Sequence, residues 1–449
     1  MSAEFERWLD RQYRRSAAAM LVSVSPVGIV KSRPGFGHTI RPVKGSIIAS
    51  PVLADWKPDP DYFFHWFRDS AVVMDAIRLL FEAGDLGADA VTHFGDFVRF
   101  SLDLQVLDGR KVIADTAWRE NVVLDFMRFL RRDDELAAVH GDAIVAETRV
   151  NPDGTLDISS WSRPQHDEAP LRALAVLRWT RVHSFDGDLQ ARVSKLVRSD
   201  LAFTFAHWRE PSIDIWEEES GQHYYTLCVS AAALREGADW LQAAGEPELA
   251  RSYRAEAEII LRVLDGFWLP DEGHYRSRTL ASGNRSAKEL DIAVILAAIH
   301  ALGDGPAHTV RDPRMHATLQ RLENVFDSAY PINRNRSAHQ GVAMGRYHGD
   351  VYFSGGAYYF STLGAAEFCY LAAAQSSQPS GWVGKGDAFL ETVRQYTPEN
   401  GELSEQFDQK TGAQTSAKHL AWSYAAFISC LAARRTVVNG AGTRQWRTR

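Results

Sequence analysis

Two glutamates that lie far apart in the chain, each close to an aromatic residue, are the strongest candidates for chemistry in this sequence. Glu217 directly follows Trp216 and opens the acidic run 217–219, and Glu405 lies two residues before Phe407. A large ring against a carboxyl group excludes water from it and raises its pKa, as a general acid needs. Three acids in the first turn of a helix are the structural alternative for 217–219. Two carboxylates on separate loops fit the acid and base of glycoside hydrolysis.

Three further stretches, 59–70, 160–167 and 345–353, each place an aromatic residue beside an arginine and an acid. A guanidinium with a carboxylate offers the donors and acceptors that vicinal sugar hydroxyls require, and a flat ring can stack on a pyranose. The alternative is that the aromatic residues fill core space and that, in the first stretch, Asp69 or Ser70 caps a helix. The side chains of these types are Tyr62, Trp66, Arg68, Asp69, Trp161, Arg163, Arg346 and Tyr352.

Composition and motifs exclude several other functions. The net charge of −7 argues against nucleic acid as a partner, because binding phosphates needs a basic face. The sequence has no phosphate-binding loop, no dinucleotide fingerprint, no Gly-x-Ser-x-Gly and no His-Glu-x-x-His, and its 15 histidines lack metal-ligand spacing. We therefore expect no cofactor and no metal.

The cysteines and the hydropathy pattern indicate the setting of the protein. Cys228, Cys369 and Cys430 are odd in number and lie in apolar helical segments, so we expect buried thiols in a reducing compartment. No stretch resembles a signal peptide or a membrane span. The sequence therefore predicts a cytoplasmic protein without a membrane partner.

Hydrophobic periodicity predicts an all-α protein whose helices pair through short links. We expect one domain over 1–449, with turns and short strands over 24–58 and a flexible basic tail over 436–449. Pairing alone leaves open whether the helices close into a ring. The expected helices are 4–22, 66–83, 87–106, 118–132, 169–183, 188–208, 222–244, 246–267, 287–301, 311–327, 357–376, 384–396 and 415–433.

The motifs, taken in order, resemble those of the glucoamylase family, glycoside hydrolase family 15. Residues 61–70 (DYFFHWFRDS) are similar to the family's DYFYTWTRDS, and 161–173 to its WGRPQNDGPALRA. Residues 214–218 (DIWEE) resemble its DLWEE, 345–352 its GRYPEDVY, and 403–408 (LSEQFD) with 422–424 its LSEQYD and WSYA. Five motifs in register cover most of the chain.

The resemblance implies an (α/α)6 barrel, a toroid of six helical hairpins with the active site in the loops at one end. It implies that Glu217 is the general acid and Glu405 the general base, with carboxyl groups about 6.5–9.5 Å apart in an inverting enzyme. It also implies that ten residues bind the sugar or shape its pocket: Tyr62, Trp66, Arg68, Asp69, Trp161, Arg163, Trp216, Glu218, Arg346 and Tyr352.

Departures from the family motifs bear on specificity. Ser162 and His166 replace a glycine and an asparagine, Phe67 replaces a small polar residue, and 356–358 (GAY) stands where fungal members have NPW. We expect an exo-acting, inverting α-glucosidase that releases β-glucose from the non-reducing ends of small α-glucosides. Specificity for α-1,6 linkages (isomaltase or dextran-glucosidase type) or for α,α-trehalose stays open, as do chain length and oligomeric state. A non-catalytic carbohydrate-sensing domain is the alternative from another class.

Overall fold

Six helices form a closed inner ring in the computed structural model, which describes residues 2–438 and 440. Each inner helix packs against the next, and the last packs against the first. Most of the side chains of these helices are buried, as expected for helices covered on all sides. The inner helices, in order around the ring, are α2 (Phe67–Glu82), α7 (Glu168–Val182), α9 (Tyr224–Ala243), α11 (Ala293–Ala301), α14 (Tyr359–Gln375) and α16 (Ala421–Val438).

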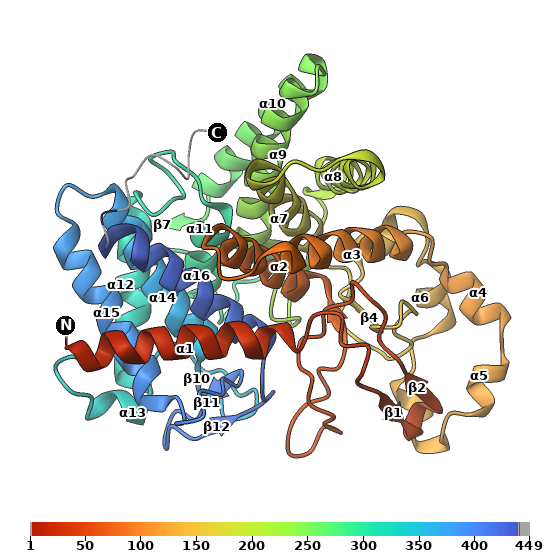
Figure 1. The fold of residues 1–449 in the computed structure, drawn as a ribbon, viewed down its shortest axis with the longest axis horizontal. Helices are drawn as coiled ribbons and strands as arrows, with labels where there is room; N and C mark the ends of the chain where they lie inside the picture. The colour runs from red at the N-terminus through yellow and green to blue at the C-terminus, as the bar shows by residue number, and fades with distance from the viewer. Residues whose placement is uncertain (1, 439, 441–449) are drawn as a thin grey trace.

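A second layer of helices covers this ring from outside. Each outer helix packs against at least one inner helix, and α1 lies alongside α16 across the front of the molecule in Figure 1. Outer helices such as α10 bury one stripe of apolar residues and leave the other side in solvent. The outer helices are α1 (Ala3–Leu21), α3 (Ala88–Leu104), α8 (Gly187–His207), α10 (Pro247–Asp265), α12 (Pro313–Ala329) and α15 (Pro379–Tyr396). Two concentric layers of paired helices make an (α/α)6 barrel, so the predicted fold is confirmed.

Short elements fill the loops between the barrel helices. Strands pair in two- and three-stranded antiparallel sheets, in the orders β1-β2, β3-β4, β5-β6-β9, β7-β8 and β10-β11-β12. The strands are β1 (Lys31–Arg33), β2 (His38–Ile40), β3 (His65–Trp66), β4 (Arg149–Val150), β5 (Ser212–Ile213), β6 (Ser220–His223), β7 (Trp268–Leu269), β8 (His274–Tyr275), β9 (Arg278–Leu280), β10 (Ala357–Tyr358), β11 (Gln406–Phe407) and β12 (Gln414–Thr415). The short helices are α4 (Gly109–Ala114), α5 (Ala117–Glu120), α6 (Asp133–Ala137) and α13 (Pro331–Arg334), with 3-10 turns at Pro34–Phe36, Leu124–Phe129 and Gly141–Ala146.

The predicted helix over 118–132 is wrong. The chain there forms α5 and then a 3-10 turn over Leu124–Phe129, because it turns to pack against the loop that precedes β2. The backbone N–H of Val123 donates to the carbonyl of Gly35, and the ring of Phe126 contacts Phe36 edge-on. This segment lies beside β1 and β2 at the right of Figure 1.

Helices α11 and α16 begin later than predicted because a loop element precedes each, and α15 begins earlier than predicted, at Pro379. The alternative that 217–219 forms the first turn of a helix is also wrong. Residues 217–219 do not open a helix, since β6 separates them from α9. Helix α11 begins only at Ala293, whose N–H donates to the Asp291 carboxylate at 2.8 Å. Strands β11 and β12 delay α16, which then continues to Val438 within the predicted tail. The rest of that tail, 439 and 441–449, lies outside the described residues.

Residues at or before the N-termini of the inner helices α2, α7, α9, α14 and α16 come together at one end of the barrel. The loops that enter them carry most of the residues singled out from the sequence, including Trp66, Trp161, Glu217 and Glu405. The three cysteines are buried and free, as expected. None of the helices in the described part of the chain is long and apolar enough to cross a membrane.

Candidate active site

A cavity of about 550 Å³ lies at the end of the barrel where the inner helices begin. Glu217 and Glu405 both line it, although 188 positions separate them in the chain. The other lining residues are Ala49, Tyr62, Trp66, Arg68, Asp69, Ser160, Trp161, Ser162, Ile215, Trp216, Glu218, Arg346, Tyr352, Phe360, Leu420 and Trp422. The two candidate catalytic acids and nine of the ten candidate sugar-contacting residues therefore come together.

Three donors from two other loops hold the carboxylate of Glu217. The indole N–H of Trp66 donates to Oε1 at 2.8 Å, and Arg68 Nη2 donates to the same oxygen at 3.2 Å. The indole N–H of Trp161 donates to Oε2. Both carboxylate oxygens accept hydrogen bonds from residues at the start of α2 and in the loop before α7. These other segments therefore fix the orientation of the Glu217 side chain.

The sequence interpretation paired Trp216 with the carboxyl group of Glu217, but the indoles that donate to this group are those of Trp66 and Trp161. The indole of Trp216 stacks on Phe360 and Trp422, with ring centroids 5.8 and 6.3 Å away. Its N–H donates to Asp291 at 2.8 Å. Trp216 therefore forms the wall of the cavity next to Glu217, while the indoles that contact the carboxylate come from elsewhere.

Asp214 ties the loop that carries Glu217 into a tight turn. Its Oδ1 accepts the backbone N–H of Trp216 at 2.7 Å, and its Oδ2 accepts that of Glu219 at 3.1 Å. Arg278 binds Asp214 Oδ2 at 2.7 Å and also pairs with Asp291. The turn places Glu217 at φ 68°, a left-handed conformation that is unfavourable for residues other than glycine.

Glu405 is buried, with 8% of its surface exposed, and has a separate set of partners. Tyr62 Oη lies 3.4 and 3.5 Å from its two carboxylate oxygens, and Ser416 Oγ donates to Oε2. Burial raises the pKa of Glu405 to about 7, although the hydrogen bond from Ser416 opposes the rise. A carboxyl group with this pKa can exchange a proton with water near neutral pH.

Glu218 and Arg346 form the charged wall next to Glu217. Arg346 binds Asp350 through two nitrogens, at 2.7 and 2.8 Å, and reaches Glu218 Oε1 at 3.1 Å. Tyr347 and Lys288 also donate to Glu218, at distances of 2.6 to 2.7 Å. Glu218 and Arg346 thus present a fixed acceptor and a fixed donor to the cavity.

Arg68 and Asp69 lie in the first turn of α2, at the floor of the cavity. Arg68 Nη1 donates to Gln165 at 2.8 Å and lies 3.4 Å from Asp167. Burial raises the pKa of Asp69 to about 6, against the opposing charge of Arg68. The sequence alternative in which Asp69 or Ser70 caps the helix is wrong, because the N-cap position is Trp66.

Arg163 does not line the cavity, and its interpretation as a sugar-contacting residue is wrong. Its Nε donates to Glu147 at 2.8 Å and its Nη2 to Asp157 at 3.0 Å, behind the loop that carries Trp161. Two buried carboxylates therefore hold its guanidinium away from the cavity. The residue supports the loop instead.

Several cavity residues were not identified as site residues from the sequence. Trp422 and Phe360 stack with centroids 4.5 Å apart and supply apolar wall. Ser162, noted only as a departure from the family motif, donates to the Glu217 carbonyl at 2.7 Å. Ser416, which donates to Glu405 but does not line the cavity, was also missed, because a lone serine in a loop is common.

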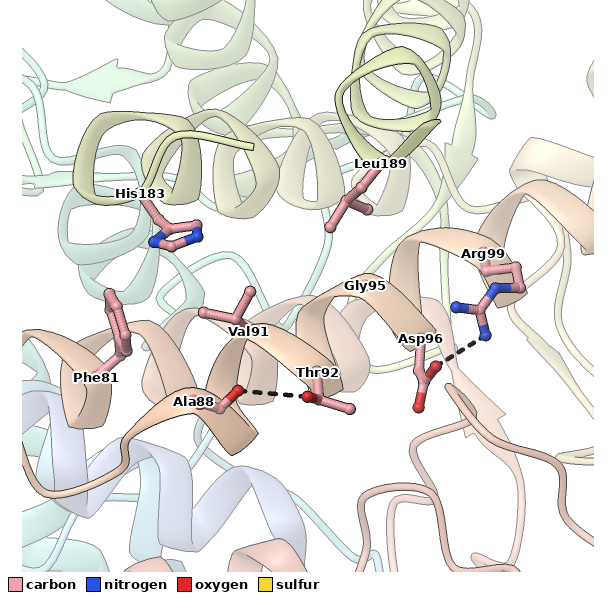
Figure 2. A pocket seen from close by; sticks show the side chains of 9 residues that line it. All are labelled: Phe81, Ala88, Val91, Thr92, Gly95, Asp96, Arg99, His183 and Leu189. Atoms are coloured by element: carbon pink, nitrogen blue, oxygen red, sulfur yellow. Dashed lines mark hydrogen bonds and ion pairs between the residues drawn. The ribbon is translucent and has the colours of Figure 1, made fainter. Parts of the chain in front are cut away.

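A second hollow lies between α3 and the start of α8 but lacks the chemistry of the first. Half of its lining side chains are apolar. Asp96 and Arg99 form an ion pair of 2.8 Å, which Figure 2 shows along one edge of the hollow. Among its lining residues Asp96 is the only carboxylate. The barrel-end cavity therefore holds the candidate pair of glutamates, and this hollow holds no second carboxylate.

The barrel and the cavity define the class of protein: an (α/α)6 toroid with two separately held carboxylates at one end. The family model described as glycosyl hydrolases family 15 matches residues 36–94, 146–384 and 375–432. The chain belongs to this family. Its unmatched internal segment contains α4, α5 and α6, which lie at the right of Figure 1.

Individual relatives agree with the family. The chain is 27% identical to a probable glucoamylase of Schizosaccharomyces pombe over 97% of the chain and 93% of that protein. It is 28% identical to glucoamylase 1 of Rhizopus oryzae over 51% of the chain and 45% of that protein. The chain spans about half the length of several curated glucoamylases that it matches.

Solved structures share the fold. The glucoamylase of Hypocrea jecorina superposes with a TM-score of 0.77 at 23% identity, over 99% of this chain and 75% of that chain. The glucoamylase of Saccharomycopsis fibuligera gives a TM-score of 0.76 at 21% identity, over 97% and 96%.

Proposed function

We propose that this protein is an exo-acting, inverting α-glucosidase that releases β-glucose from the non-reducing ends of small α-glucosides. The observation that carries the proposal is that Glu217 and Glu405 line one cavity, each held by its own partners. No direct hydrogen bond joins them within the described part of the chain. Inversion requires room for a sugar and a water between the two carboxyl groups, and the cavity of about 550 Å³ that both line supports this requirement.

In this proposal Glu217 is the general acid and protonates the glycosidic oxygen. Trp66 and Arg68 fix one carboxyl oxygen and Trp161 the other, so the carboxyl group can move little. A positioned acid contributes about 10²–10⁴-fold to the rate.

Glu405 is the general base that removes a proton from the attacking water. Its ionised form has Ser416 as a donor and the Tyr62 hydroxyl nearby, and the remaining lone pairs are free to accept from water. With a pKa of about 7, Glu405 has a basicity suited to this task near neutral pH.

The walls between the two acids would bind the terminal glucose. Arg68, Asp69 and Arg346 offer donors and acceptors to hydroxyls, and Tyr62, Trp66 and Tyr352 offer ring faces. A cavity of about 550 Å³ suits one or two sugar units rather than a long glucan lying across it.

The leaving-group side is where linkage specificity would be decided. Tyr358, in the segment where fungal members have NPW, is buried and donates to Asp350 at 2.9 Å, so it does not form that wall. Trp56 instead approaches from the loop before α2, with its ring centroid 5.8 Å from that of Trp161. We therefore include α-1,6 linkages and α,α-trehalose among the substrates to be tested.

The proposal is tested with maltose, isomaltose and trehalose, using proton NMR to identify the first anomer of glucose released. We expect β-glucose from at least one of them, and a rate reduced at least about 100-fold in Glu405→Gln with glucose still bound. The leaving glucose unit also contributes α-anomer, so the decisive result is the anomer formed at the attacked carbon. Release of the non-reducing glucose as the α-anomer, or an unchanged rate in Glu405→Gln, would overturn the proposal. Glucose binding without turnover of any α-glucoside would favour the carbohydrate-sensing alternative.

A further inference from the structure

Glu272, His274 and Glu289 converge at a place that has no part in the proposed reaction. Glu272 lies in the turn between β7 and β8, His274 in β8, and Glu289 in the segment that leads to α11. Each offers one ligand atom, and these atoms all lie within 4.8 Å of one another. None of the three lines the catalytic cavity.

His274 is the reason to regard this cluster as more than a group of acids. Its side chain is 3% exposed, and among the residues that the structure describes its Nε2 has no hydrogen-bond partner. A buried ring nitrogen without a partner is unfavourable unless something else binds it. Nε2 lies 4.0 Å from Glu272 Oε2, so the nitrogen faces the carboxylates.

The other ring nitrogen of His274, Nδ1, favours the tautomer that can bind a metal through Nε2. Nδ1 lies 3.5 Å from the backbone carbonyl of Glu272, and that oxygen can only accept. A proton on Nδ1 leaves a lone pair on Nε2, which is how a backbone carbonyl commonly orients a metal-binding histidine.

Arg285 occupies the space beside the two carboxylates. Its Nε donates to Glu289 Oε1 at 2.7 Å, and its Nη2 pairs with both Glu272 and Glu289. The Arg285 side chain is 62% exposed, whereas that of Glu289 is 11% exposed. The two glutamates thus already accommodate a positive charge, and the arginine that provides it can withdraw into solvent.

We propose that Glu272, His274 and Glu289 bind a divalent transition-metal cation of the Zn²⁺ type, which displaces the guanidinium of Arg285. One imidazole nitrogen with two carboxylates is a ligand set that suits Zn²⁺, with water in the fourth position. Calcium and magnesium prefer more oxygen ligands than these three side chains supply. The bound ion would link the β7–β8 turn to the segment that precedes α11.

The test is titration of metal-free, full-length protein with ZnCl₂ by calorimetry and with CoCl₂ by visible absorption. We expect one equivalent to bind, and Co²⁺ to give the absorption of a nitrogen- and oxygen-ligated ion. Glu272→Gln should weaken binding at least about tenfold, as loss of a ligand does. Arg285→Ala should tighten binding, because the competing cation is gone.

The choice of variants keeps the test decisive. Glu272 lies on a turn and is only partly buried, so Glu272→Gln should fold even if a variant of buried His274 does not. His339→Gln, at an exposed histidine elsewhere, should bind as the unmodified protein does. No saturable binding, or equal binding by Glu272→Gln, would overturn the proposal. Weaker binding in Arg285→Ala would also contradict it, because that result would assign Arg285 a supporting role.

Discussion

The indole N–H of Trp66 donates to Glu217 Oε1 at 2.8 Å, across the cavity wall from the loop that carries the glutamate. Trp216, next to Glu217 in the sequence, binds Asp291 instead. The residue that positions the proposed acid is therefore 151 positions away from it in the chain. The hydrogen-bond donor Trp66 can therefore be substituted while the carboxyl group of Glu217 is retained.

Trp66→Phe keeps an aromatic side chain but removes the indole N–H together with the five-membered ring that bears it. A hydrogen bond to a charged group contributes about 1.5–3 kcal/mol, so we expect kcat/KM to fall roughly 10- to 100-fold. Trp240→Phe, on the outer side of α9, is the matched control and should leave kinetics unchanged. A Trp66→Phe protein with full activity would show that the hydrogen bond does not position the acid.

Glu405 must be ionised to act as a base, and its folded pKa is about 7. We therefore expect kcat/KM to rise with pH through about 7, because the protonated fraction cannot accept a proton from water. The Ser416 hydrogen bond lowers this pKa, so Ser416→Ala should move the rising limb to higher pH. The control Ser429→Ala, in α16, should not change the pH at which kcat/KM rises. A limb that is unmoved in Ser416→Ala would contradict the assignment of Glu405.

Asp214→Asn should damage both stability and catalysis, because the turn that carries Glu217 depends on its two oxygens. An amide cannot accept at both positions, and Arg278 loses an ionic partner. Breaking a buried ion pair costs about 3–5 kcal/mol, which urea unfolding would measure. Asp188→Asn removes an exposed pair with Arg192 and should cost less than about 1 kcal/mol. Equal losses in the two variants would show that the turn is not held by Asp214.

Arg346 and Arg163 give opposite expectations for the same substitution. Arg346 lines the cavity, so Arg346→Lys should raise KM, since lysine cannot reproduce its paired contacts with Asp350. Arg163→Lys should lower the free energy of unfolding by about 1–3 kcal/mol while KM stays the same. Steady-state kinetics and urea unfolding of both variants would separate the two roles. A raised KM in Arg163→Lys would restore it to the substrate site.

The barrel helices were largely predictable because each carries its own pattern. Long apolar stretches such as those of α9 and α14 mark inner helices, and the one-sided pattern of α10 marks an outer helix. Closure of the ring was not predictable from periodicity, because it depends on α16 packing against α2 across the whole chain. The 3-10 turn at 124–129 was missed because contacts with Gly35 and Phe36 override a helical pattern.

The types of residue in the site could be predicted from the sequence, but the direction in which each side chain points could not. Aromatic, arginine and carboxylate residues in the loops indicated a sugar site, and all but Arg163 of the candidates line the cavity. Arg163 has the same sequence neighbourhood as a cavity residue, and only the positions of Glu147 and Asp157 reveal that it points elsewhere. Ser416 and Asp214 act through hydrogen bonds that the spacing of residues in the sequence does not predict.

The left-handed backbone at Glu217 sets a limit on how stable this protein can become. An L-residue in that conformation costs about 1–2 kcal/mol, and glycine is the residue that avoids the cost. Selection for thermostability alone would favour glycine at the position where the proposed reaction needs its general acid. The protein therefore carries a small, permanent loss of folding free energy at its reacting group, and the hydrogen bonds of Asp214 are what keep that conformation populated.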